Sequence, residues 1–197
     1  MKYSIASVLL AAIAVCSVFA AEPVSRRDAA RLQAKLDRIA KMDGSRGKGA
    51  ASTPITETEL NAYLRYELGD RLPAGVTEPW VSLLDNGRVS GRATVDLQRV
   101  GQSRKSDSML DPYSLLTGSL PLAVNGVLKT KNGVGTFALE SASLSGVPIP
   151  AWMLHEIVSY YSKSAVTPNG VSLEKPFVLP SGIREIQLVK GQALVVQ

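Results

Sequence analysis

The sequence predicts an α+β fold in which an antiparallel sheet of long strands is the larger part. Apolar residues recur with a period of about 3.6 in three segments, and with a period of two in the stretches between the second and the third. Two Asn-Gly pairs, Asn86-Gly87 and Asn132-Gly133, stand between alternating segments, as in tight hairpins. The order of helix, hairpins, helix and strands is typical of an α+β chain.

The first residues have the pattern of a secretory signal. Lys2 is followed by an apolar run over residues 5–19, and the small side chains up to Ala20 suit signal peptidase, so we expect cleavage after Ala20. This run of about fifteen residues is short beside the roughly twenty that a membrane-spanning helix needs, and an uncleaved anchor is the alternative. The sequence therefore predicts a periplasmic or secreted protein.

The only cysteine, Cys16, lies inside this run. Residues 13–16 loosely match a lipoprotein processing site, although Val15 is larger than the side chain that such a site prefers. Lipidation at Cys16 is therefore a second alternative. If the chain is cut after Ala20, the remainder has no cysteine, which excludes disulfides, thiol nucleophiles and zinc–cysteine sites.

Charge divides the remaining chain into two parts. Residues 22–49 hold eight basic and four acidic residues, and this net +4 accounts for nearly all of the +5 of the full chain. We expect a signal peptide at 1–20, a basic helical arm and flexible linker at 21–52, and a single α+β domain at 53–197. Nucleic acid is not an expected partner, because the basic residues are not interleaved with aromatic ones.

Residues 24–42 predict a helix with a narrow apolar stripe at Leu32, Leu36 and Ile39. The stripe fits a helix packed on its own domain. The charged face also fits contact with anionic lipid headgroups, so contact with a membrane surface through the arm stays open. Residues 44–54 are rich in Gly, Ser and Ala and indicate a linker.

The domain opens with a helix at residues 57–68. Thr56 and Glu59 have the spacing of a capping box, and Ile55 and Leu60 have that of a hydrophobic staple. The period then changes to two, with one face apolar and the other polar. We expect strands at residues 80–84, 89–97, 120–128 and 134–144.

The second half of the domain repeats the change of period. Residues 146–150 break the sheet, and Pro150 suits the first turn of a second amphipathic helix at 151–163. We expect final strands at 171–179 and 183–196, the latter a hairpin around Lys190-Gly191.

The sequence holds little that indicates catalysis. His155 is the only histidine, and no Gly-x-Ser-x-Gly turn accompanies it. The carboxylates are not clustered for calcium or zinc, and a Gly-rich phosphate loop is missing. We therefore expect no enzymatic activity, no metal and no cofactor. A hydrolase built on His155 or on paired carboxylates is the third alternative.

Three segments together resemble a known family. They read ITETELNAYL at residues 55–64, GVPIPAWML at 146–154 and LPSGIREIQL at 179–188. In this order they resemble bacterial envelope proteins of the DUF2993/LmeA type and YpmS-like domains, which are similar to tubular lipid-binding (TULIP) proteins. The resemblance covers about residues 53–197. It implies a curved antiparallel sheet that wraps a long helix and leaves an apolar tunnel, and non-enzymatic binding of an acyl chain or similar ligand. For this chain we expect a curved antiparallel sheet of long strands wrapped on two amphipathic helices.

The residues agree with that expectation. Small inward residues, Gly91 and Ala93, beside larger ones could leave an apolar groove between the sheet and the two helices. The expected groove residues are Leu60, Leu64, Val95, Leu97, Val124, Leu154, Ile157 and Val158. The same residues can instead fill a dry core.

Two functional hypotheses follow. The leading one is an exported, non-enzymatic protein that binds or carries a lipid or other hydrophobic small molecule in the cell envelope. The alternative is an envelope scaffold or assembly factor with a filled core, which binds a partner protein through its arm or a sheet edge. Trp80 and Trp152 fit either simple packing or a place at a groove mouth or membrane interface.

Overall fold

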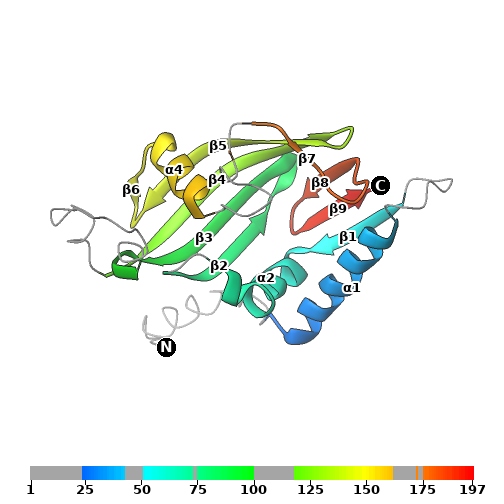
Figure 1. Ribbon diagram of the computed structural model, residues 1–197, viewed down its shortest axis with the longest axis horizontal. Coiled ribbons are helices and arrows are strands. Elements are labelled where there is room, and N and C mark those ends of the chain that lie inside the picture. Colours follow the sequence, from blue (N-terminus) through cyan, green and yellow to red (C-terminus); the bar gives the residue numbers. More distant parts are fainter. Residues whose placement is uncertain (1–23, 43–50, 73–74, 100–117, 162–171, 173–174) are drawn as a thin grey trace, which may run out of the picture.

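The computed structural model describes residues 24–42, 51–72, 75–99, 118–161, 172 and 175–197. It confirms the α+β fold, with an open antiparallel sheet as its largest part (Figure 1). The six-stranded sheet has the order β2-β3-β4-β5-β6, with β7 also paired to β5, and a second sheet has the order β1-β9-β8. The predicted signal peptide lies outside the described residues.

The helices are α1 (Arg26–Met42), α2 (Glu57–Tyr66) and α4 (Ala151–Tyr161), with short 3₁₀ helices η2 (Gly69–Arg71) and η3 (Asp85–Gly87). The large sheet holds β2 (Val76–Leu83), β3 (Arg88–Asp96), β4 (Ser119–Lys131), β5 (Val134–Leu144), β6 (Val147–Pro148) and β7 (Phe177–Val178). The small sheet holds β1 (Ser52–Thr56), β8 (Glu185–Val189) and β9 (Gln192–Val196).

The local signals that set the ends of α2 and of the hairpins are confirmed. The Thr56 hydroxyl accepts a hydrogen bond from the Glu59 N–H, and the Glu59 carboxylate accepts one from the Thr56 N–H, which completes the capping box. Asn86 and Asn132 have φ angles of 60° and 52°, each followed by a glycine at positive φ. These are the angles that a tight hairpin turn requires.

The predicted linker is wrong at its end. Ser52–Thr56 form β1, which pairs antiparallel with β9 at the other end of the chain. Thr53 and Ile55 are buried, so the strand has a distinct inner face. Pro54 lacks an N–H donor and hid this strand from the sequence pattern, but β1 is an edge strand, where proline is tolerated.

The expected boundary between a basic arm and the domain also differs from the packing. Leu32 and Ile39 of α1 are only 2% and 3% exposed and belong to the same core cluster as Ile55 and Leu188 of the small sheet. The narrow stripe read from the sequence is thus wide enough to bury α1 against its neighbours. Helix α1 is part of the domain.

The main hydrophobic core lies where α1, α2 and the small sheet pack together at one end of the large sheet (Figure 1). Its buried members are Leu32, Ile39, Ile55, Leu83, Leu179, Ile183, Leu188, Ala193 and Val195. Val81, Val89 and Leu128 of the large sheet pack against this cluster. The Thr130 hydroxyl and the Ile186 backbone exchange hydrogen bonds and hold the small sheet to β4.

A charged contact joins α1 to the start of α2. The Lys35 ammonium donates to both carboxylate oxygens of Glu59, at 2.7 and 2.8 Å, and to the Pro54 carbonyl. Burial alone would raise the pKa of Glu59. The hydrogen bonds from Lys35 and from the Thr56 N–H, with the charge of Lys35, outweigh burial and hold this pKa below its ordinary value.

This contact predicts a loss of stability in acid. Because the pKa of Glu59 is lowered on folding, its contribution is present above the ordinary carboxyl pKa of 4.5 and is lost as the pH falls through and below that value. We expect Glu59→Gln to lower the free energy of unfolding by about 2 kcal/mol at neutral pH and by much less near pH 3, in urea titrations. Glu140→Gln, in an exposed pair with Arg88, is the control. An equal loss at both pH values would contradict the assignment.

Candidate functional site

The inner face of the large sheet continues beyond the core as an apolar surface. Gly91 of β3 lies opposite Val124 of β4, and Ala93 and Val95 lie opposite Leu122 and Leu120. Directly opposed residues share one face of a sheet, and residues two apart on a strand do as well. These six residues therefore lie on the same face as Val89, which packs on the core. We call them the distal apolar face.

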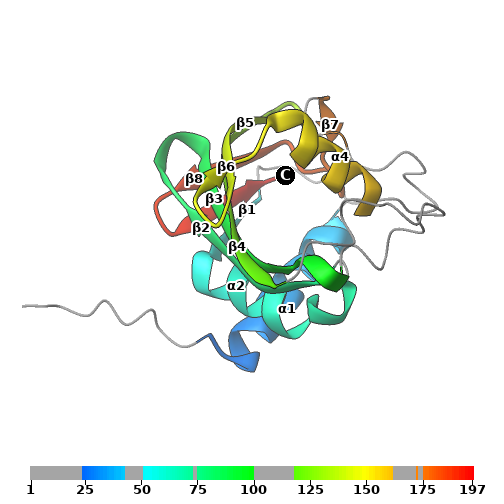
Figure 2. The ribbon, with the colours of Figure 1, turned by 90° about the vertical axis from the view of Figure 1, so that its left-hand side faces the viewer.

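The distal apolar face is less completely packed than the core. All six of its residues are half-buried, whereas the cluster at the other end of the sheet is buried. Viewed from one end, the large sheet is an arc, and α4 lies on the open side of that arc (Figure 2). Helix α4 packs on β5, where Ala142, which is opposite Val124, is buried, and Leu154 of α4 is buried as well.

The eight expected groove residues fall in several places. Val95 and Val124 belong to the distal apolar face, and Leu154 is buried on α4, the helix that packs on β5. Leu60 packs against the main core, which is a structural position, and Leu64 lines a separate cleft. Leu97 follows the end of β3, and Val158 is half-buried on α4. The Ile157 side chain lies outside the described residues.

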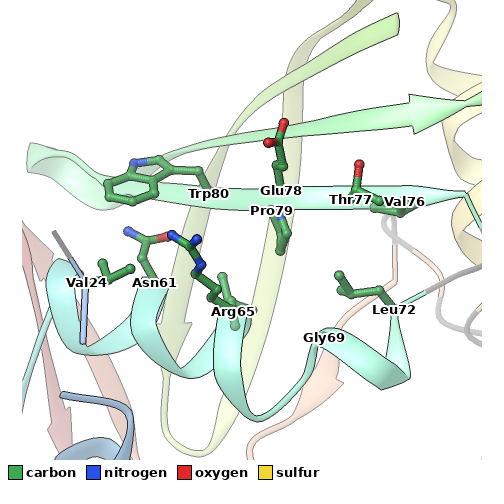
Figure 3. Close-up of a pocket in the computed structure, with 11 residues that line it drawn as sticks. Val24, Asn61, Arg65, Gly69, Leu72, Val76, Thr77, Glu78, Pro79 and Trp80 are labelled. Atoms are coloured by element: carbon green, nitrogen blue, oxygen red, sulfur yellow. The ribbon is translucent and has the colours of Figure 1, made fainter. Parts of the chain in front are cut away.

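A second feature is a cleft of about 370 Å³ between α2 and β2 (Figure 3). This volume is in the range of small-molecule sites. The lining residues come from the start of α1, from α2 and η2, and from β2: Val24, Asn61, Leu64, Arg65, Gly69, Leu72, Val76, Thr77, Glu78, Pro79 and Trp80. Of these, Leu64 and Trp80 were candidate site residues in the sequence.

Helix α2 closes the free edge of β2 with side chains. The Asn61 amide accepts from the Val81 N–H at 2.7 Å and donates to the Val81 carbonyl at 2.8 Å and the Glu57 carbonyl at 3.0 Å. The Glu57 carboxylate accepts from the Leu83 N–H. Asn61 is 1% exposed, so its polar atoms are fully used within the protein. An unpaired strand edge would otherwise be open to other chains.

A β-bulge in β2 turns the one acidic residue of the cleft lining away from the helix. The register between β2 and β3 shifts between Thr77 and Trp80, and Glu78 has a φ of 51°. Figure 3 shows the Glu78 side chain on the side of the strand opposite to α2. There its carboxylate accepts a hydrogen bond from the Thr94 hydroxyl at 3.1 Å.

Two guanidinium groups meet at one aromatic ring beside the cleft. The central guanidinium carbon of Arg65 lies 5.7 Å from the centre of the Tyr66 ring, and that of Arg26 lies 5.0 Å from it. Both are within cation–π distance. The Tyr66 hydroxyl donates to the Val24 carbonyl, which ties the ring to the start of α1. Within the described part of the chain, neither arginine has a carboxylate at ion-pair distance.

The other candidate side chains give little indication of a functional site. The Nδ1 of His155 is buried and has no hydrogen-bond partner, so no described carboxylate orients this ring as in a catalytic triad. Across the described residues, no group of three His, Cys, Asp or Glu side chains could hold a metal ion. The same residues include no helix that is both long and apolar enough to cross a membrane. Trp152 and Val147 are 63% and 65% exposed near the start of α4.

These features define an α+β protein with an open, curved antiparallel sheet, packed at one end and half-covered at the other. No protein-family model matches the chain, and no curated protein matches it. The resemblance to tubular lipid-binding proteins therefore stays a prediction.

Proposed function

We propose that this protein binds an acyl chain or a similarly elongated apolar ligand on the distal apolar face. The observation that carries the proposal is the contrast along one sheet face. Val89, Ala93 and Val95 lie in one row and are all half-buried, but only Val89 packs against the core cluster. Apolar surface that stays partly exposed is typical of a ligand or partner site.

The energetics of such binding are those of chain burial. Each methylene removed from water contributes about 0.8 kcal/mol, so a chain lying along several strands gains affinity without directed polar contacts. The small side chains of Gly91 and Ala93 leave room for it, since a Cβ added at Gly91 would meet only the Val124 carbonyl oxygen at 3.9 Å. Leu154 and Ala142, which are buried, would form one wall.

The location and role in the cell form part of the same proposal. An export signal at residues 1–20 would deliver the protein to the periplasm or the medium, where a carrier of lipid without enzymatic activity would meet membrane lipids. Pulse-labelling of the full chain tests this: a processed form that begins at Ala21 is expected, and an acylated Cys16 would replace simple cleavage by lipidation.

A scaffold that binds a partner protein is the second candidate function. It is favoured by the exposed apolar side chains of Val147 and Trp152, because aromatic residues are enriched at protein interfaces. The two functions differ in what occupies the apolar surface. Purification of the full protein without detergent, followed by native mass spectrometry and lipid extraction, separates the two functions. A near-stoichiometric amount of lipid supports the carrier. A complex with a partner protein that contains no lipid supports the scaffold.

Filling the distal apolar face should abolish binding. We expect Gly91→Leu to remain folded and to lower affinity for a fluorescent fatty acid by about tenfold or more, because the new side chain occupies the space proposed for the chain. Ser90→Leu adds the same side chain to the opposite face of the same strand and should bind as the parent does. Unchanged affinity in a folded Gly91→Leu protein would show that the ligand does not bind on the distal apolar face.

A further inference from the structure

We propose that the cleft between α2 and β2 binds an organic anion, a phosphate ester or carboxylate joined to a ring or short apolar group, through the guanidinium of Arg65. This site goes beyond the proposed function and does not depend on it, because it has its own lining residues and a free charge that the distal apolar face lacks. The two sites are therefore testable separately.

The charge of the cleft lining favours an anionic ligand. Arg65 and Glu78 are the charged residues of the lining. The Glu78 carboxylate lies beyond the strand, bonded to the Thr94 hydroxyl, and makes no ion pair with Arg65. In Figure 3 the Arg65 side chain rises from α2 toward β2, beside Asn61 and below Trp80. Among the described residues, the cleft thus presents an exposed cation without a counter-charge, which favours an anion.

The Arg65 guanidinium lies against an aromatic ring, beside a second cation. Arg65 and Arg26 both lie over the Tyr66 ring, which is held by its hydrogen bond to Val24. Two guanidinium groups near one ring repel each other, and an anion between or beside them relieves that repulsion. A planar guanidinium can donate two parallel hydrogen bonds to a phosphate or carboxylate, so it favours such oxyanions.

The rest of the cleft lining is largely apolar and would contact the remainder of the ligand. Leu64, Leu72 and Val76 supply apolar surface, and the Trp80 ring borders the cleft. The Asn61 amide is occupied by the Val81 backbone and adds no free donor. A volume of about 370 Å³ accepts a ring or a short chain with its charged group, but not an entire membrane lipid.

The test uses the full protein and 1-naphthyl phosphate as the probe, with calorimetric titration. We expect Arg65→Gln to weaken binding about tenfold or more, and Arg26→Gln to weaken it by a smaller factor. Arg38→Gln removes an exposed charge from α1 and should leave binding unchanged. Neutral 1-naphthol should bind at least about tenfold more weakly than the phosphate, because it lacks the anion that Arg65 recognises.

Three outcomes would overturn the site: equal binding by Arg65→Gln, equal binding of 1-naphthol, or an equal loss in Arg38→Gln, which would indicate diffuse attraction alone. Sedimentation with vesicles that contain phosphatidic acid distinguishes the source of the anion. Vesicle binding that requires Arg65 and is displaced by 1-naphthyl phosphate assigns a lipid headgroup. Binding of the soluble probe without vesicle binding assigns a soluble ester. Fatty-acid binding by Gly91→Leu and Arg65→Gln, measured together, separates failure of this site from failure of the distal apolar face.

Discussion

Asn61→Ala should lower the free energy of unfolding by about 2–4 kcal/mol. The side chain is almost wholly buried and satisfies both backbone groups of Val81, together with the Glu57 carbonyl. Its removal leaves the N–H and the carbonyl of Val81 without partners, and a buried polar group that loses its hydrogen bond costs about 1–3 kcal/mol. Urea unfolding followed by circular dichroism measures the change.

Asn125→Ala is the matched control for Asn61. Asn125 also makes a side-chain hydrogen bond, to the Ser141 hydroxyl, but it joins two side chains on the large sheet and closes no strand edge. We expect a loss below about 1 kcal/mol there. A loss of this small size in Asn61→Ala would show that water replaces the amide at the edge of β2. Increased self-association of Asn61→Ala would further support the role of α2 in covering that edge.

Leu32→Ala should lower the free energy of unfolding by about 3 kcal/mol, because truncation of a buried leucine removes apolar contacts and leaves a cavity. Leu32 lies on α1 at 2% exposure, within the core cluster. Deletion of residues 22–49 should therefore abolish cooperative unfolding, since it exposes the side of the core that α1 covers. This expectation differs from the predicted division into an arm at 21–52 and a domain at 53–197, under which the shortened chain would stay folded.

Arg38→Ala controls for changes on α1 that do not touch the core. Arg38 is exposed on the same helix, and its replacement should change the free energy of unfolding by less than about 0.5 kcal/mol. If the shortened chain unfolds cooperatively with the same midpoint temperature as the parent protein, α1 is an arm outside the domain. Such a chain would also show a smaller acid sensitivity at Glu59, because Lys35 would be absent and only the Thr56 hydrogen bonds would remain.

The candidate site was only partly predictable from sequence. Val95 and Val124 were expected to share an apolar face because alternation fixes the side on which each residue lies, and the strand register agrees. Leu60 was expected beside them, but helical periodicity does not say which sheet residues a helix meets, and Leu60 packs on the core instead. The Arg65–Tyr66–Arg26 group had no sequence signal, because Arg26 joins the neighbouring Arg65 and Tyr66 only through the packing of α1 on α2.

The sequence by itself determined the features that depend on neighbours along the chain. The capping box of Thr56 and Glu59 and the turn at Asn86 are set by contacts within a few residues, so composition and spacing predict them. Only the tertiary structure decided that β1 pairs with β9, that α1 belongs to the core and that Glu78 turns away from Arg65. Each of these depends on burial and on hydrogen bonds between segments far apart in sequence, which local periodicity does not encode.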